Sequence, residues 1–489
     1  MPSTEERATH KGLALALLAM TQFVIVLDAS IVNVALPSIG RDLDFSQDNL
    51  SWVVNAYTLT FGGFLLLGGR LADLLGRRRM FISGLILFSL ASLAGGLAQS
   101  DIWLITARGV QGLGAAIISP AALSLVTTMF AEGAERNKAL GVWGAVAGSG
   151  GAAGVLLGGV LTEYAGWEWV LFVNVPIGLL AAFAAPRLLP ESRDDRPRVF
   201  DLAGAFTVTA GLAIFVYAMV DANNAGWGST QTVGLLALSL ALLASFIVIE
   251  SRTSHPLMPF SIFRLRTLRG ADVVGLLIGM SLFSMFFFIS LYLQQVLGYD
   301  ALKAGIAYLP LAFTIIVSAG MASQLVNRFG FKPVLIAGML FITAGLVWFS
   351  NVSAPGGTYV GDVLFPSLLA AVGLGFAFVP VTIAAVTGTR PDEAGLASGL
   401  INTAQQVGGA LGLAILVAVA NGRTSDVIAS GVRNQAVALT EGFQDAFLVG
   451  AGFALLGAVL AAVMISSRDS REHAEAAQRG EAEPATAVA

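Results

Sequence analysis

The chain has 489 residues, of which 56% are hydrophobic and only 12% are charged, with a mean hydropathy of +0.79. No ordinary soluble domain needs so much apolar surface, so the composition excludes that class and indicates a polytopic membrane protein. The absence of cysteine excludes a disulfide framework and thiol chemistry. The net charge of −4 is uninformative, whereas the distribution of charge along the chain is not.

Apolar runs of the length that crosses a bilayer as a helix, about 20 residues, recur along the whole chain. The first run carries Asp28, Asn33 and Pro37 and lacks a small-residue cleavage site, so it is predicted to be a retained helix and not a signal peptide. Hydropathy predicts about fourteen transmembrane helices, near residues 12–36, 50–70, 79–98, 102–127, 138–162, 167–187, 201–221, 231–250, 270–297, 304–326, 332–351, 361–388, 395–421 and 441–466.

Two polar, basic segments divide these runs into groups of six, two and six. They lie at Pro190–Arg198 and between Glu250 and Arg269. We therefore expect an all-α protein with an N-terminal six-helix bundle over 1–189 and two inserted helices with flanking cytoplasmic segments over 190–269. A C-terminal six-helix bundle over 270–467 and a disordered tail over 468–489 would follow.

Basic residues predict the orientation of the chain. The loop with Arg77, Arg78 and Arg79 is expected on the cytoplasmic side, and an even helix count then places both termini there. Of the 27 lysines and arginines, this arrangement puts outside only Arg41, Lys303, Arg423 and Arg433, with Arg108 inside a helix. Such an asymmetry supports both the orientation and the helix count.

Asp28 lies inside the first predicted helix, and Arg108 lies inside the fourth. Ionisable groups in a bilayer are costly and are functional candidates by default. Asp28 is about 24 Å from the cytoplasmic start of its helix and Arg108 about 9 Å below the outer surface, so the two lie at similar depth. They are candidates for proton coupling, and a static ion pair between helices is the alternative.

A turn between the second and third helices contains an acid, two glycines and a basic cluster, at Gly69, Asp73, Gly76, Arg77 and Arg78. Charges of this kind cannot lie in hydrocarbon, so a tight turn at the membrane surface is predicted. A degenerate copy of the turn, Gln324–Lys332, lies between the corresponding helices of the second group. Internal repeats of this kind are typical of transporters with a substrate site between two halves.

The fifth helix carries Gly150, Gly154 and Gly158 at four-residue spacing. These glycines form a smooth ridge that allows another helix to approach closely and to slide. Conformational change is the functional interpretation, and tight packing is the ordinary one.

These segments resemble those of the fourteen-helix drug:proton antiporter family of the major facilitator superfamily. The loop from Gly69 to Arg79 matches the family's signature between its second and third helices, and Leu104–Ala116, with Arg108 and Gln111, is similar to its fourth-helix motif. Gly154–Gly159 is similar to the antiporter motif, although Val155 replaces proline. Trp167–Gly178 is similar to the start of the sixth helix, although Glu168 replaces arginine. The resemblance covers nearly the whole chain.

The resemblance implies proton-coupled export of a lipophilic, amphipathic compound by alternating access, without an enzymatic reaction. Asp28 and Arg108 would couple the proton, and the Gly69–Arg78 loop with the glycine ridge would act in gating. The expected partners are protons, a small lipophilic substrate and the lipid bilayer of the bacterial inner membrane. We expect a monomer with no cofactor, no metal site and no nucleic acid.

Substrate contacts are less well defined by the sequence. Phe288, Tyr292 and Gln295 share one face of the ninth predicted helix, and aromatic faces suit flat lipophilic or cationic compounds. The other candidates are polar residues within helices: Gln111, Asn402, Gln405 and Gln406. Packing or lipid contact is the alternative for the aromatic residues. A dedicated exporter of one metabolite, an importer, a channel and a membrane-embedded enzyme are the alternatives for the whole protein.

Overall fold

The computed structural model describes residues 4–45, 50, 52–131, 133–191, 201–253, 256, 258–354, 356–390 and 393–479. Regular structure in these residues is entirely helical. The first polar segment, Pro190–Arg198, and the final residues 480–489 lie mostly or wholly outside this part of the chain.

The helices fall into three consecutive groups. The first contains α1 (Thr4–Asp42), α3 (Trp52–Leu75), α4 (Arg77–Gly96), α5 (Asp101–Met129), α6 (Ala134–Tyr164), α7 (Trp169–Phe172) and α8 (Asn174–Leu188). The inserted group contains α9 (Leu202–Ala225), α10 (Thr230–Arg252) and the short 3-10 helix η1 (Phe260–Arg264). The last contains α11 (Arg266–Leu291), the π-helix η2 (Tyr292–Val296), α12 (Ala301–Ala307), α13 (Leu309–Phe329), α14 (Phe331–Phe349), the π-helix η3 (Tyr359–Leu364), α15 (Phe365–Val386), α16 (Ala394–Ala429), α17 (Gln435–Met464) and α18 (Ser467–Arg479).

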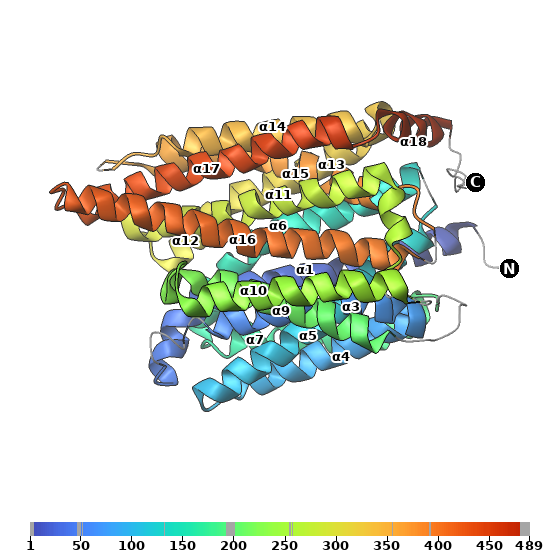
Figure 1. The fold of residues 1–489 in the computed structure, drawn as a ribbon, viewed down its shortest axis with the longest axis horizontal. Coiled ribbons are helices and arrows are strands. Elements are labelled where there is room, and N and C mark those ends of the chain that lie inside the picture. Colours follow the sequence, from blue (N-terminus) through green and yellow to red (C-terminus); the bar gives the residue numbers. More distant parts are fainter. Residues whose placement is uncertain are drawn as a thin grey trace.

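The long helices run roughly along one common direction (Figure 1). The first group occupies one half of the molecule and the last group the other half, and both chain termini lie at the same end. We refer to this end as the terminal end and to the other as the opposite end. Successive long helices of the first group run in alternating directions, so α1 and α4 begin at the terminal end and α8 ends there. The position of a residue along its helix therefore gives its depth between the two ends.

Twelve helices in the described residues are long and apolar enough to cross a membrane, and the bent helix α6 makes thirteen if its two parts count as one span. The two parts of α6 meet at an angle of 43°. The apolar stretch of α9, Ala203–Met219, is shorter than the other spans. The predicted all-helical membrane fold is therefore confirmed, whereas the count of fourteen spans is not.

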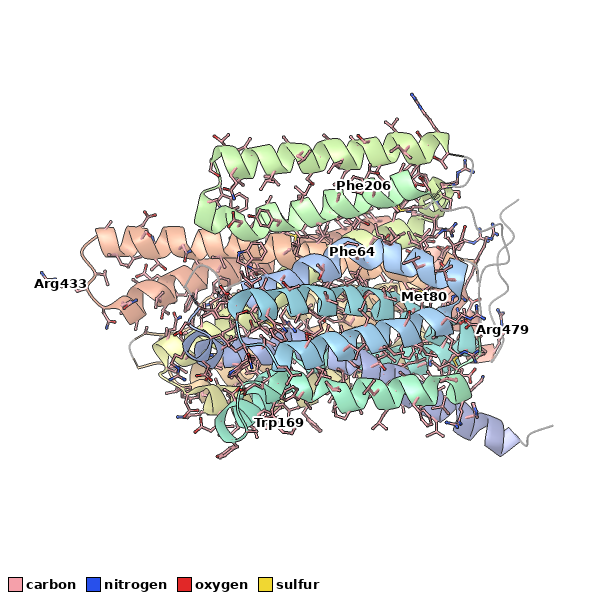
Figure 2. The ribbon with its side chains drawn as sticks, turned by 90° about the horizontal axis from the view of Figure 1, so that it is seen from below. Phe64, Met80, Trp169, Phe206, Arg433 and Arg479 are labelled. Atoms are coloured by element: carbon pink, nitrogen blue, oxygen red, sulfur yellow. The ribbon has the colours of Figure 1, made fainter. Side chains whose placement is uncertain are left out.

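The inserted pair lies beside the two halves (Figure 2). Helix α9 contacts α3 of the first half and α16 of the second, and α10 packs on α9. Small residues allow the close approach to α3, since a Cβ on Gly63 would lie 3.0 Å from the Cβ of Ala213. Most of α10 faces outward; Leu240, for example, is 62% exposed.

This arrangement makes a labelling prediction for the inserted pair. Cysteines introduced at Phe215 on α9 or Leu242 on α10 should resist water-soluble thiol reagents in inward- and outward-facing states, because the pair packs beside the two halves. The natural chain has no cysteine, so the background is zero. Labelling that substrate slows at either position would contradict this placement.

The chain after the last long helix differs from the expected disordered tail. Residues Ser467–Arg479 form helix α18, which packs on α13 and α14. Four of its five buried residues, Ser470, His473, Ala474 and Ala477, recur at helical spacing, and the His473 ring lies 5.6 Å from that of Phe331. The segment is polar overall, and its few alanines do not raise the hydropathy enough to predict burial. The expectation of a disordered tail from residue 468 is therefore wrong for residues 468–479.

Candidate functional site

Asp28 and Arg108 form a fully buried ion pair inside the first half. Arg108 Nη1 donates to Asp28 Oδ2 over 2.6 Å, and both side chains are 0–1% exposed. The pairing of these two residues, expected from their similar depths, is therefore present. A buried pair is retained only when further hydrogen bonds satisfy both groups, because removing two charges from water costs several kcal/mol per ion.

Those further bonds come from two amides. Gln111, one turn after Arg108 on α5, donates to Asp28 Oδ1 over 2.8 Å and accepts from Arg108 Nη1 over 2.7 Å. Asn174, the first residue of α8, donates to Asp28 Oδ1 over 2.6 Å. The carboxylate thus accepts three hydrogen bonds from two other helices.

Two more residues complete the cluster around Asp28. The hydroxyl of Ser92 on α4 accepts from both Gln111 and Asn174 over 3.0 Å and donates to the carbonyl of Leu171. The Tyr57 ring on α3 lies 4.4 Å from the guanidinium carbon of Arg108, a cation–π contact. We call Asp28, Tyr57, Ser92, Arg108, Gln111 and Asn174 the carboxylate network.

Protonation of Asp28 would break this arrangement. A neutral carboxyl is a weaker acceptor and no longer balances the charge of Arg108, whose Nη2 already lacks a hydrogen-bond partner within the described residues. Because the network residues come from α1, α3, α4, α5 and α8, a rearrangement of their hydrogen bonds would act on several helices at once. The network therefore links the charge of Asp28 to the positions of several helices in the first half.

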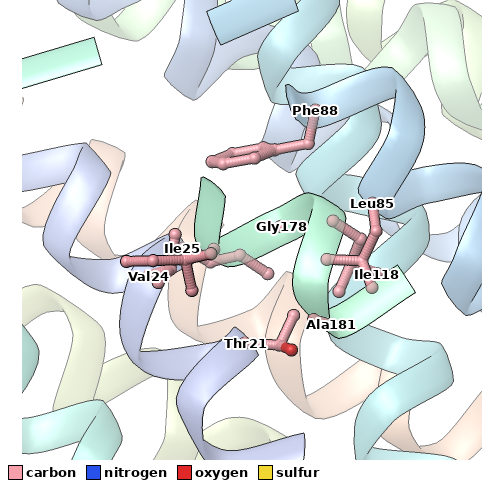
Figure 3. A pocket seen from close by; sticks show the side chains of 9 residues that line it. Thr21, Val24, Ile25, Leu85, Phe88, Ile118, Gly178 and Ala181 are labelled. Atoms are coloured by element: carbon pink, nitrogen blue, oxygen red, sulfur yellow. The ribbon is translucent and has the colours of Figure 1, made fainter. Parts of the chain in front are cut away.

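A small apolar pocket, whose lining is drawn in Figure 3, lies on the terminal side of the network. Its residues precede the network members on α1 and α4 and follow Asn174 on α8. Its lining includes Ile25, Phe88 and Gly178, which lie three or four residues from network members on α1, α4 and α8. The hydroxyl of Thr21, in the same lining, donates to its own helix at the carbonyl of Leu17. With no free polar group in its lining, the pocket does not favour a bound water between Asp28 and the terminal end.

The glycine ridge of α6 packs against α1 around Asp28. A Cβ on Gly154 would lie 2.7 Å from the carbonyl oxygen of Leu27, and one on Gly158 would lie 2.7 Å from that of Ile31. A Cβ on Gly150 would lie 2.9 Å from the Cβ of Val26. The ridge therefore sets the position of the helix segment that carries the carboxylate.

The ridge yields a second prediction. Gly154→Ala should push α1 away from α6 and lower transport at least severalfold, because overpacking of this kind costs about 1–3 kcal/mol. The matched control is Gly151→Ala, since a Cβ there meets only Phe286 at 3.9 Å. Transport rates of the two variants at equal membrane levels would test this, and equal rates would contradict it.

The charged turn joins the two halves at the terminal end. Asp73, fully buried at the end of α3, accepts from the backbone N–H groups of Gly395 and Leu396 over 3.2 and 3.1 Å, at the start of α16. Arg77 binds the same carboxylate with its Nη2 at 2.9 Å. A carboxylate here satisfies orphan N–H groups and complements the helix dipole, so Asp73 caps a helix of the other half.

The other residues of the turn shape this contact. A Cβ on Gly69 would lie 2.7 Å from the carbonyl oxygen of Gly395, so only glycine permits the approach of α16. Gly76 adopts a φ of 109°, which favours glycine, and Gly330 in the degenerate copy adopts a φ of 84°. Arg78 donates to the carbonyl of Leu189 over 3.1 Å and lies 3.7 Å from Glu191.

A second polar contact between the halves lies at the same end. Asn137 of α6 donates to Asn327 of α13 over 2.5 Å and contacts the ring nitrogen of His473 on α18. Ser323 donates to the carbonyl of Asn137 over 2.8 Å. Together with the Asp73 cap, these bonds close the seam between the halves at the terminal end.

The expected substrate residues do not come together. Phe288 is buried against Phe443 and Phe447, and Tyr292 donates to the carbonyl of Ser353 over 2.7 Å. Gln295 is exposed, because the π-helix that begins at Tyr292 changes the helical register. Packing, the alternative interpretation, describes Phe288 and Tyr292 better than a shared binding face does.

The polar candidates separate into two places. Gln111 belongs to the carboxylate network. On α16, Asn402 donates to the carbonyl of Ser398 over 2.8 Å, Gln405 lies against α11, and the Cβ of Gln406 lies on the α3 side, where a Cβ on Gly62 would meet it at 3.9 Å. Gln406 is thus placed near the seam between the halves.

Sequence reasoning assigned no role to Ser92, Asn174 or Tyr57. Asn174 lies in Trp167–Gly178, the segment similar to the start of the family's sixth helix, and this motif is the sequence signal that could have identified it. Ser92 is one of several small polar residues in its helix and has no distinguishing pattern. No group of acidic or histidine residues in the described chain is arranged to hold a metal ion.

The chain matches the family model described as Major Facilitator Superfamily over residues 18–413. It is 41% identical to the puromycin resistance protein of Streptomyces alboniger over 460 residues, which cover 93% of this chain and 91% of that protein. It is 42% identical to the cephamycin export protein of Amycolatopsis lactamdurans over 455 residues, 92% of each chain. The multidrug transporter protein MdtP of Bacillus subtilis is 32% identical over 429 residues, 87% of this chain and 78% of that one.

Solved structures share the fold at low identity. The proton:xylose symporter XylE superposes with a TM-score of 0.67 at 14% identity, covering 94% of this chain and 97% of that one. The human organic anion transporter MFSD10 gives a TM-score of 0.66 at 15% identity, with 94% and 100% covered. These likenesses concern the fold alone.

Proposed function

The chain belongs to the major facilitator superfamily and is a multi-pass membrane transporter, not an enzyme; from this premise we propose that it exports a small lipophilic compound in exchange for protons. The observation that carries the proposal is the carboxylate network: a single buried acid holds together several helices of one half. Relatives across most of the chain are named for antibiotic resistance or export, which supports outward transport of such compounds.

We propose alternating access between the two halves, with the terminal end towards the cytoplasm. The cluster of arginines at this end supports the orientation. The carboxylate network would take a proton from the outer side and lose it inside, and the Asp73 cap would form and break as the inner side closes and opens. The protein would act as a monomer in the bacterial cytoplasmic membrane.

The substrate is proposed to be neutral or to carry one positive charge. Few acids lie deep in the helices, which does not suit a dication. Two of the relatives are named for a single antibiotic and another for many drugs. A dedicated exporter of one compound is therefore the second candidate.

The test is uncoupler-sensitive efflux from a bacterium that lacks its own exporters, measured with a panel of antibiotics, dyes and biocides. Export of several unrelated lipophilic compounds that stops with a proton uncoupler would support the multidrug proposal. Export of one compound alone would favour the dedicated exporter. Flux that the uncoupler does not change would contradict proton coupling.

A further inference from the structure

Helix α11, in the other half of the molecule, carries an acid whose carboxyl group is buried and which the mechanism proposed above does not use. Asp272 lies on α11, six residues after Arg266, or about 9 Å into the helix from the terminal end. The residue as a whole is only partly buried, but both of its carboxyl oxygens are out of contact with solvent and have no hydrogen-bond partner. No ion pair involves it within the described part of the chain.

Charged groups on the surrounding elements are placed elsewhere. On α16 the charged residues Arg423 and Asp426 lie at the opposite end, as do Glu441 and Asp445 on α17, and α15 has none. At the start of α11, Arg266 donates to the carbonyls of Met464 and Val463. Asp469 accepts from Thr267, and Arg269 is exposed. On α3, Asp73 is held by Arg77 and the start of α16, and Arg70 forms no ion pair with Asp272.

An ionised carboxylate in these surroundings would be uncompensated, at a cost of several kcal/mol. The neutral acid avoids that cost. A proton is also the cation that fits, because it needs no volume and both oxygens are covered. Organic cations and metal ions would need a path and further ligands that the site does not offer.

Water is excluded from Asp272 by an apolar seal on its terminal side. Leu268, one turn earlier on α11, is fully buried and packs in a hydrophobic cluster with Leu66 of α3 and Leu396 of α16. The cluster, which we call the inner seal, draws on both halves and on the inserted pair: Leu66, Ala205, Val208, Phe246, Met258, Ile262, Leu268, Leu396 and Ala397.

The inner seal depends on the same contact that closes the terminal end. Leu396 both belongs to the seal and donates its N–H to Asp73. Separating α3 from α16 therefore breaks the seal and exposes the acid. Gly275 of α11 lies against Ile401 of α16, and these two helices run parallel, so Ser398 on α16 lies at a level similar to that of Asp272. The Ser398 hydroxyl is also buried and without a partner.

From this geometry we infer that Asp272 is a second proton-binding site, occupied while the terminal end is closed and emptied when the inner seal opens. It lies in the half opposite to Asp28 and deepens the proposed proton-coupled export, on which its transport role rests. Its proton would leave towards the terminal end each time the halves separate there. The site would take up its proton from the opposite end while that end is open, so one further proton would cross the membrane in each cycle.

The direct test needs no substrate, so it stands even if the exported compound is misidentified. The infrared spectrum of the purified full-length protein at neutral pH should contain the carbonyl band of a protonated carboxyl group. The band should be missing in Asp272→Asn and retained in the control Asp362→Asn, whose acid accepts from the N–H groups of Ser353 and Thr358 at the opposite end. Identical spectra of the wild type and Asp272→Asn in the carboxyl region would overturn the inference.

The second test measures coupling in liposomes. At a pH difference of one unit, the drug gradient at which net flux stops should fall about tenfold in Asp272→Asn, because one proton fewer contributes its free energy. Asp362→Asn should keep the wild-type gradient. An unchanged gradient in Asp272→Asn would overturn the transport role.

Discussion

Asp28→Asn is expected to abolish proton-driven export while the protein still inserts into the membrane. Asparagine keeps the size of the side chain and can still accept from Gln111 or Asn174, but it cannot exchange a proton. It also leaves the guanidinium of Arg108 buried without its counter-charge. Breaking one partner of a buried pair typically costs about 3–5 kcal/mol, so reduced stability should accompany the loss of transport.

The double variant Asp28→Asn with Arg108→Gln separates these two effects. Removing both charges removes the unpaired cation, so much of the lost stability should return. Transport should not return, because the proton-binding group is still missing. Thermal unfolding and uphill efflux measured on the same preparations provide the comparison. Restored uphill efflux in the double variant would mean that Asp28 and Arg108 form only a structural ion pair.

Asp73→Asn is the second change with a large expected effect. The variant loses the charge that caps α16 and pairs with Arg77, both in a buried position. The contact that closes the terminal end should weaken by about 1–3 kcal/mol, which corresponds to a shift of roughly 5–150-fold between open and closed states. We expect efflux to fall strongly while substrate binding and folding persist.

Binding and efflux must be measured separately for this variant. The control is Arg79→Gln, because Arg79 is largely exposed and only approaches Glu191 at 3.6 Å. Normal efflux by Asp73→Asn would reduce its carboxylate to a local structural cap. A loss of folding in Asp73→Asn would also contradict the prediction, since it assigns the residue to one state of the cycle and not to the whole fold.

The elements that the sequence predicts well are those with strong local signals. Long apolar runs indicate the helices, and the similar depths of Asp28 and Arg108 indicate that these two side chains can meet. The turn from Gly69 to Arg78 is predicted at a junction of charged and apolar sequence. Hydropathy does not reveal which segment contacts this turn. The N–H groups of α16 that bind Asp73 lie more than three hundred residues further along the chain.

The remaining differences have specific physical causes. Ser92 and Asn174 are uncharged and short, so their presence in a helix is inexpensive and gives no signal. The π-helix at Tyr292–Val296 inserts an irregular turn, which separates Gln295 from the face shared by Phe288 and Tyr292 under regular spacing. The alanine stripe of α18 is too weak in hydropathy to stand out from a polar tail.

The position of α9 sets a mechanical limit on the two halves. Because α9 contacts both α3 and α16, the halves cannot part freely along this side without one of these contacts sliding. Towards the opposite end the stacked rings of Trp52 and Tyr217, 5.3 Å apart, oppose sliding, whereas the small residues Gly63 and Ala213 farther along allow it. We therefore expect the two halves to tilt about the aromatic stack on the side of the inserted pair. The largest displacement should occur on the other side, at the seam between α6 and α13.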